Sequence, residues 1–273
     1  MSLGSRVRVA IETECSAIKA GNVHPYASFS DLNHGQFVAA AKAIGERVDN
    51  CHGQPVGQIV LQCVHAMIQT TGTNTSLGTI LLMAPLVVAA SRIAQVQIEE
   101  NSLQASVRET LFQLTPDDSR TIYEAIRIAK PGGLGESMSM DLRESAPDNI
   151  LDAMRLAAGW DDIALQYVSD FELVFAIARR INIKEALGLS KLDSIRCLQV
   201  ELLSERVDSL IERKQGLVIA KDVQSQASEV IGSGPYGSPE YEVAWHRLDN
   251  RLRDKRHRGN PGTIADLIAA SLF

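Results

Sequence analysis

The residues best suited to chemistry lie in short polar segments between long apolar stretches. The first of these segments carries a carboxylate, an ammonium group, an amide and an imidazole, on Glu14, Lys19, Asn22 and His24, around Gly21. The glycine is sufficient for a turn, because it adopts the left-handed backbone conformation without strain. A turn does not need the ionisable groups beside it, so these groups indicate a site.

Three further polar segments have the same setting, at residues 72–78, 131–136 and 260–266. Each falls between segments with the apolar periodicity of helices. This arrangement predicts that the four segments meet at one end of a helical body. The glycines of segment 131–136 are a weak phosphate-loop signal, because no strand precedes them, and a polar flap is an equally good interpretation.

The last polar segment predicts a phosphate site. Asn260 is expected to cap a helix, Pro261 suits its first position, and Gly262 leaves the free backbone N–H groups open to approach. Such a helix start attracts phosphate through these donors and the helix dipole. Asp266, one turn further on, would hold Mg²⁺ on that phosphate. An ordinary capped helix is the alternative, but basic residues crowd between positions 247 and 258 and favour phosphate.

Four hydrogen-bonding side chains precede the apolar helical segment that begins at Leu77. They belong to Thr73, Asn74, Thr75 and Ser76. One of them is enough to cap a helix. The others would bind a nucleotide base or ribose, or satisfy buried backbone groups, and the sequence favours neither.

Two pairs of aspartates resemble the diphosphate–magnesium clamps of all-α isoprenoid synthases, at residues 117–118 and 161–162. Neither pair has the third carboxylate that such clamps carry on the same helical face. Both pairs also suit helix N-termini, where negative charge is stabilised by the dipole. A prenyl-diphosphate enzyme is therefore a weak alternative.

Composition limits the classes of protein. The chain has 273 residues, 45% of them hydrophobic, and a net charge of −6, which disfavours nucleic acid as a partner. The four cysteines form no Cys-x-x-Cys pair, as expected of free thiols in a reducing compartment. The longest apolar run, 77–90, is short of the roughly 20 residues that span a bilayer, and no hydrophobic signal opens the chain. A soluble cytoplasmic protein is expected.

Helical periodicity predicts an all-α fold: a single compact domain, 1–273, of about ten to twelve helices. Residues 77–96 are expected to form a buried central helix, because they are apolar on nearly every face. A first helix is expected from Val7 to Gly21, and one long helix over 195–211. Proline-marked starts are expected after Thr115, Ser145 and Ser238. Exposed faces of the long helices would allow a homodimer.

Taken in order, these segments resemble the triphosphoribosyl-dephospho-coenzyme A synthase family. The similarity runs from about Glu14 onward. It rests on Lys19-x-Gly-Asn-Val with Asp31 and Phe37 downstream, Asn74-Thr-x-x-Gly, Asp208-Ser-Leu-Ile-x-Arg-Lys-x-Gly, and Asn260-Pro-Gly-Thr-x-Ala-Asp-Leu. The family is all-α and uses ATP with a divalent cation. Its members join the ribose 2′-hydroxyl of 3′-dephospho-coenzyme A to C1′ of ATP and release adenine.

The resemblance implies roles for particular residues. Glu14 or Asp31 would act as the base and stabilise positive charge on the ribose, and Asp266 would hold Mg²⁺. Lys19, Arg213, Lys214 and the start of the last helix would hold the triphosphate. The full set of nucleotide- and phosphate-binding candidates is Lys19, Gly21, Asn22, His24, Asn74, Thr75, Arg213, Lys214, Asn260 and Gly262.

The chain departs from the lyase-associated members of this family. Ser76-Leu77 stands where they carry His-Lys, His24 where they carry aspartate, and residues 132–136 where they have a glutamate-rich segment. In these positions it resembles a branch from archaea and methylotrophic bacteria. A related nucleotide acceptor is therefore an alternative to dephospho-coenzyme A. A non-catalytic nucleotide-binding regulator on the same fold is the second alternative.

Overall fold

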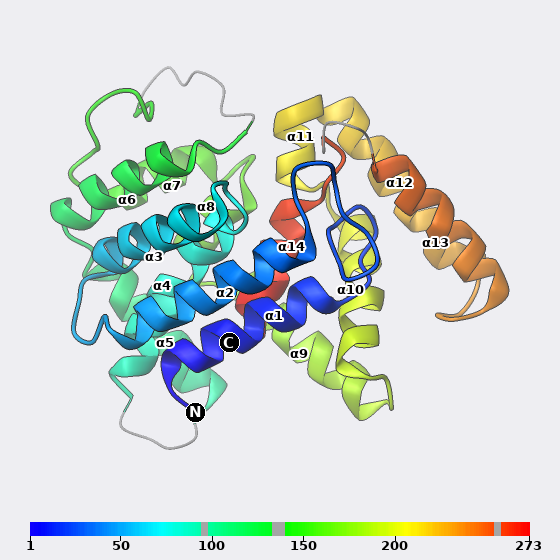
Figure 1. Cartoon of the computed structure of the whole chain (residues 1–273), viewed down its shortest axis with the longest axis horizontal. Coiled ribbons are helices and arrows are strands. Elements are labelled where there is room, and N and C mark those ends of the chain that lie inside the picture. The colour runs from blue at the N-terminus through cyan, green and yellow to red at the C-terminus, as the bar shows by residue number, and fades with distance from the viewer. Residues whose placement is uncertain (94–97, 133–139, 254–257) are drawn as a thin grey trace.

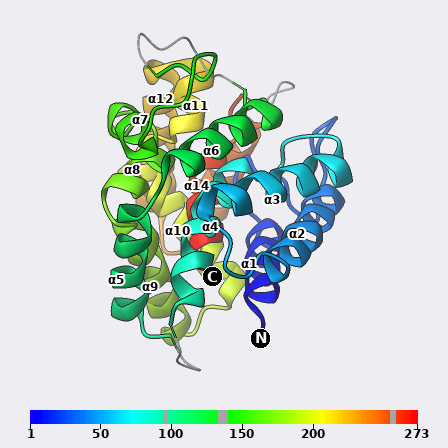
Figure 2. The same cartoon turned by 90° about the vertical axis from the view of Figure 1, so that its left-hand side faces the viewer.

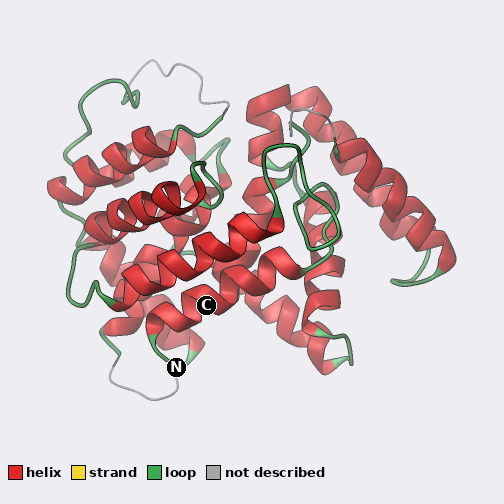
Figure 3. Cartoon of the chain, in the orientation of Figure 1, coloured by secondary structure: helices red, strands yellow, loops and turns green. Residues whose placement is uncertain are grey.

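The computed structural model describes residues 1–93, 98–132, 140–253 and 258–273. Within these ranges the chain forms fourteen helices and no strand, which confirms the all-α class with more helices than expected (Figure 3). The helices are α1 (Leu3–Ser16), α2 (His34–Asp49), α3 (Val56–Thr71), α4 (Leu77–Ser91), α5 (Glu100–Phe112), α6 (Pro116–Ala129), α7 (Ile150–Ala157), α8 (Asp162–Val168), α9 (Glu172–Ala186), α10 (Lys191–Glu205), α11 (Ser209–Gln215), α12 (Leu217–Ser233), α13 (Pro239–Leu252) and α14 (Gly262–Ser271).

The helices are arranged around α4 and α14. On one side α1 packs against α2, α2 against α3, and α3 against α6. On the other side α10 packs against α12, and α12 against α13, and this last pair projects outward (Figure 1). In the perpendicular view, α4 and α14 lie between α1–α3 on one side and α7–α8 on the other (Figure 2). The central position of α14 brings distant parts of the sequence together.

Helix α4 is the predicted buried central helix. Its residues are apolar and mostly buried, and it packs against α1, α3, α5, α8 and α14. The predicted end at Val96 is wrong, because the helix stops at Ser91 and Arg92 is its C-cap. Residues 94–97 lie outside the described part of the chain.

Capping side chains fix several helix starts as expected. Thr115 opens α6 with a capping box, since its hydroxyl accepts from Asp118 N and the Asp118 carboxylate accepts from Thr115 N. Ser238 caps α13. The start expected after Ser145 is wrong: α7 begins at Ile150, capped by Asn149.

Two expected helices are shorter in the structure. Helix α1 ends at Ser16 rather than Gly21, because Lys19 folds back and its ammonium group takes the backbone oxygens of Glu14 and Ala17. The helix expected over 195–211 is divided into α10 and α11. Asp208 causes this break, because its Oδ1 accepts from the first free backbone N–H groups of α11.

The four cysteines are all free. None of the described helices combines the length and apolar character needed to cross a membrane.

Candidate active site

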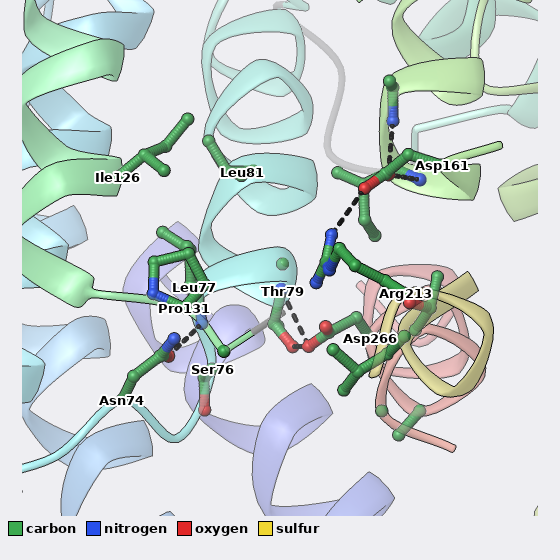
Figure 4. Close-up of a pocket in the computed structure, with 18 of the residues that line it drawn as sticks. Asn74, Ser76, Leu77, Thr79, Leu81, Ile126, Pro131, Asp161, Arg213 and Asp266 are labelled. Atoms are coloured by element: carbon green, nitrogen blue, oxygen red, sulfur yellow. Dashed lines mark hydrogen bonds and ion pairs between the residues drawn. The ribbon is translucent and has the colours of Figure 1, made fainter. Parts of the chain in front are cut away.

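A cavity of about 1260 Å³ lies where the polar segments meet (Figure 4). Residues of α1, α4, α6, α7, α8, α11 and α14 line it, together with loop residues that include the segment before α4. Pockets for drug-sized ligands measure roughly 300–1,000 Å³. The cavity therefore has room for a nucleotide and part of a second ligand.

Most of the sequence-derived candidates line this one cavity, although they come from distant parts of the chain. The candidates that line it are Glu14, Asn22, Asp31, Asn74, Thr75, Arg213, Lys214, Asn260, Gly262 and Asp266. Lys19, Gly21 and His24 do not.

Glu14 and Lys19 form a buried ion pair. Lys19 is fully buried, and its Nζ lies 2.9 Å from Glu14 Oε1. Burial raises the pKa of Glu14, and the charge of Lys19 partly opposes this. Lys19 therefore acts on Glu14 from behind the cavity wall, and the sequence-based role as a direct triphosphate ligand does not fit its position.

Asp266 lies on α14 and faces the start of α4. Its Oδ1 accepts hydrogen bonds from Thr79 N, at 2.9 Å, and from Thr79 Oγ1. Burial raises the pKa of Asp266 to about 7, with Glu14 and Asp208 adding to the shift and the Thr79 hydrogen bonds opposing it. The close approach requires Gly78, because a Cβ there would collide with Asp266 Oδ2. The cavity thus contains two carboxylates whose ionisation is opposed by burial.

The start of α14 differs from the expected phosphate site. Asn260 does not cap the helix; its Oδ1 accepts instead from Asn22 Nδ2, at 2.6 Å. The free N–H of Ile264 is taken by Asp208 Oδ2, at 2.8 Å. A carboxylate of the chain itself therefore occupies part of the expected anion site, while Gly262 still lines the cavity.

Asp208 opens one of the sequence motifs, but its structural role was not predicted. One carboxylate oxygen caps α11 and the other binds the start of α14, so this side chain fixes two helices of the site relative to each other. Its full burial raises its pKa to about 6. Its place before Ser-Leu-Ile is the signature of an N-cap, which was a usable signal for α11. The link to α14 has no sequence signal.

Arg213 and Lys214 bring positive charge to the cavity from α11. Arg213 Nη1 pairs with Asp161 Oδ2 at 2.9 Å, and its buried Nε has no hydrogen-bond partner among the described residues. A buried donor without a partner is costly, so this nitrogen is well suited to an anionic ligand.

In each aspartate pair one residue caps a helix and the other forms an ion pair with an arginine. Asp161 Oδ1 caps α8 through the N–H groups of Ile163 and Ala164. Asp118 belongs to the α6 capping box and also accepts from Gly57 N. This use explains both pairs without a diphosphate clamp.

The turn around Gly21 is structural. Gly21 has a φ of 71°, its N–H donates to Asp249, and a Cβ there would meet Leu252 at 2.6 Å. His24 is buried beside Arg253, and its pKa is lowered to about 4, first by burial and then by this guanidinium. An uncharged, buried His24 does not suit the expected phosphate contact.

Two arginines of the basic run behind this turn are paired with carboxylates. Arg253 pairs with Asp249, and Arg251 pairs with Asp222. Residues 254–257, which include two more of the basic residues, lie outside the described part of the chain.

The hydrogen-bonding residues at the start of α4 make contacts within the chain and also line the cavity. Asn74 Oδ1 accepts from Leu77 N at 3.1 Å and so acts as a cap, while Ser76 Oγ donates to Thr75 Oγ1. Asn74, Thr75 and Ser76 also line the cavity, so their polar side chains remain positioned for a ligand. Residues 133–139 of the glycine-containing segment lie outside the described residues.

Fold and cavity together define an all-α protein with a nucleotide-sized site lined by carboxylates and cations. The model of the family ATP:dephospho-CoA triphosphoribosyl transferase (CitG) matches residues 1–273, and the chain belongs to this family. The chain is therefore a transferase, with ATP and dephospho-CoA as the substrates that its family implies. This confirms the family inferred from the motifs.

A solved structure from Archaeoglobus fulgidus, described as that of a candidate triphosphoribosyl-dephospho-coA synthase, has the same fold. The TM-score is 0.61 at 21% sequence identity, over 87% of this chain and 94% of that one. At this identity the likeness shows the fold alone. No curated protein matches the chain in sequence.

Proposed function

We propose that the cavity is the catalytic site for triphosphoribosyl transfer and that Glu14 and Asp266 carry its chemistry. The observation that supports this most is the presence of two carboxylates with raised pKa values, Glu14 buried and Asp266 half-buried, on the wall of a cavity that also holds Arg213 and Lys214. Glycosyl transfer needs negative charge near the ribose and positive charge near the phosphates.

The reaction needs no outside acid or base. The acceptor 2′-oxygen forms a bond to C1′ of ATP as the bond from C1′ to the adenine nitrogen breaks, and the triphosphate stays intact. The electron pair of the broken bond leaves with adenine. The proton lost by the acceptor hydroxyl balances the proton gained by adenine, so a group that accepts the first can return it.

Glu14 is the preferred base. Its raised pKa makes it a better proton acceptor than an exposed glutamate. Its negative charge would also stabilise the positive ribose of the transition state. Asp31 is the second candidate, on the exposed edge of the same cavity.

Arg213, Lys214 and the polar residues before α4 would bind the phosphates and the donor nucleotide. The buried Nε of Arg213 supports this role. Asn22, Asn260 and Gly262 line the same cavity and complete its polar part. Lys19 is then a positioning residue, which orients Glu14 and moderates its pKa.

Asp266 suits Mg²⁺ bound together with ATP. The described residues contain no group of three or more acidic, histidine or cysteine side chains that could hold a metal by themselves. Mg²⁺ in nucleotide sites commonly takes one or two carboxylates and completes its shell with phosphate and water, which matches a single Asp266. The cation would neutralise charge on the triphosphate.

We also infer that residues 1–273 act as one domain. The buried core draws on helices from α1 to α14, and the cavity needs both ends of the described sequence.

The test is product analysis with ATP, Mg²⁺ and dephospho-CoA. Free adenine is expected, without ADP. Glu14→Gln should lower the turnover by about 100-fold or more, as expected for loss of a general base, whereas Glu12→Gln on the same helix should leave it unchanged. Glu12 is the matched control because it pairs with Arg8 and does not line the cavity. ADP as the product would refute the mechanism, and binding of ATP without any turnover would favour the regulator.

A further inference from the structure

One part of the cavity has a different character from the carboxylates and cations. Here an apolar wall is formed by Ile150, Ala153, Met154, Leu156 and Ala157 of α7 together with Trp160. Helix α7 packs against α8 and α6. Figure 4 shows Arg213 between Asp266 and Asp161, the residue that follows Trp160. Arg213 therefore lies between the carboxylate of Asp266 and the segment that follows α7.

Helix α7 is amphipathic, and its apolar face is turned to the cavity. Its charged residues, Asp152 and Arg155, pair with each other at 2.6 Å and do not line the cavity. Ile150 and Met154 are buried, but Leu156 and Trp160 are 54% and 51% exposed. Large apolar side chains that line a cavity and remain half exposed are a feature of ligand sites.

The two substrates of the family differ in what they offer such a surface. ATP carries no aliphatic part. Dephospho-CoA is an ADP unit that bears a pantetheine arm, an uncharged chain with a branched dimethyl group, two amides and a thiol. Helix α7 spans about 10 Å from Ile150 to Ala157, which suits an extended arm better than a purine base.

We propose that the apolar wall binds the pantetheine arm of dephospho-CoA and that Leu156 and Trp160 determine the preference for this acceptor. The inference rests on the proposed function. An acceptor held in this way directs its reactive ribose toward Glu14 and Asp266 and leaves Arg213 and Lys214 to the triphosphate of ATP. The wall then favours an acceptor that carries the arm, in comparison with ADP, which lacks it.

Calorimetry with two fragments of the acceptor tests this assignment. The first probe, 4′-phosphopantetheine, has the arm but no adenosine, and the second, ADP, lacks the arm. Leu156→Ala and Trp160→Ala should each weaken 4′-phosphopantetheine binding by about tenfold, because the arm would then bury less apolar surface, and leave ADP binding within twofold. Leu187→Ala is the control, because Leu187 is 76% exposed and does not line the cavity. Equal weakening of both probes, or of neither, would overturn the proposal.

Kinetics separate this proposal from the proposed function. In the adenine-release assay, 4′-phosphopantetheine should compete with dephospho-CoA and not with ATP. If 4′-phosphopantetheine binds and the two variants weaken it, but no adenine is released, the proposed function fails and the subsite stands. If adenine is released and 4′-phosphopantetheine does not compete with dephospho-CoA, the subsite is wrong and the transfer reaction stands.

Discussion

Replacing Glu14 by glutamine removes the negative partner of a fully buried ammonium group. At the observed 2.9 Å between Lys19 Nζ and Glu14 Oε1, and an effective dielectric constant of about 20, the Coulomb attraction is about 6 kcal/mol. The net loss of stability is smaller than this attraction, because the Lys19 ammonium group still has its hydrogen bonds to the backbone oxygens of Glu14 and Ala17 in the variant. Breaking buried pairs costs about 3–5 kcal/mol, and we expect about 3 kcal/mol here.

Urea and thermal unfolding followed by circular dichroism would measure this loss. For a chain of this length, about 3 kcal/mol lowers the melting temperature by about 6–12 °C. Glu12→Gln, which breaks only the more exposed pair with Arg8, should cost less than about 0.5 kcal/mol. A Glu14→Gln protein as stable as the control would show that the pair is not a buried charge interaction, and the reasoning about Glu14 would be refuted.

A double-mutant cycle separates stability from catalysis. Lys19→Met alone leaves a buried carboxylate without its cation, while Glu14→Gln with Lys19→Met removes both charges of the pair. The double variant should therefore lose less stability than the sum of the two single changes, by about 2 kcal/mol. It should nevertheless remain inactive, because the carboxylate is absent. Recovered activity in the double variant would exclude Glu14 as the base.

Three further changes test the rest of the site. The pKa of Asp266 is raised to about 7 from roughly 4 in an unfolded chain, so its contribution to stability is complete below about pH 4 and is lost as the pH rises through 7. In urea titrations, the free energy of unfolding of Asp266→Asn relative to that of the wild type should therefore increase from pH 5 to pH 8. Parallel pH profiles of the two unfolding free energies would contradict this. Asp208→Asn removes one acceptor from the α11–α14 link and should cost about 1–2 kcal/mol in urea unfolding while raising the KM for ATP; an unchanged KM would argue against a positioning role. Gly78→Ala should displace Asp266 and reduce adenine release, whereas Gly232→Ala, with open space around it in α12, should keep activity and raise stability by up to about 1 kcal/mol.

Local sequence signals predicted the parts of the fold that depend on residue type and on contacts between residues close in the sequence. The apolar character of α4 is visible without any partner, and the caps at Thr115 and Ser238 satisfy N–H groups only a few residues away. The convergence of Glu14, Asn74 and Asp266 on one cavity also followed from the setting of their polar segments between helices.

Long-range contacts account for what the sequence did not predict. The end of α1 depends on Lys19 folding back under the cavity wall, and the start of α14 depends on Asp208, 56 residues before Ile264. A cap from so distant a side chain leaves no mark on the local pattern. Asn260 was a reasonable cap by residue type, but its oxygen binds Asn22 instead.

The hydrogen bond from Thr79 N to Asp266 Oδ1 joins residues 187 positions apart. Thr79 lies in the first turn of α4, where backbone N–H groups have no acceptor within their own helix. Protection of this amide from deuterium exchange therefore comes from α14 and not from α4. Slow exchange at Thr79 would mean that α14 is docked and the active-site carboxylate is in place. Faster exchange there, with the interior of α4 still protected, would reveal a partly opened protein that has lost its site while keeping its core.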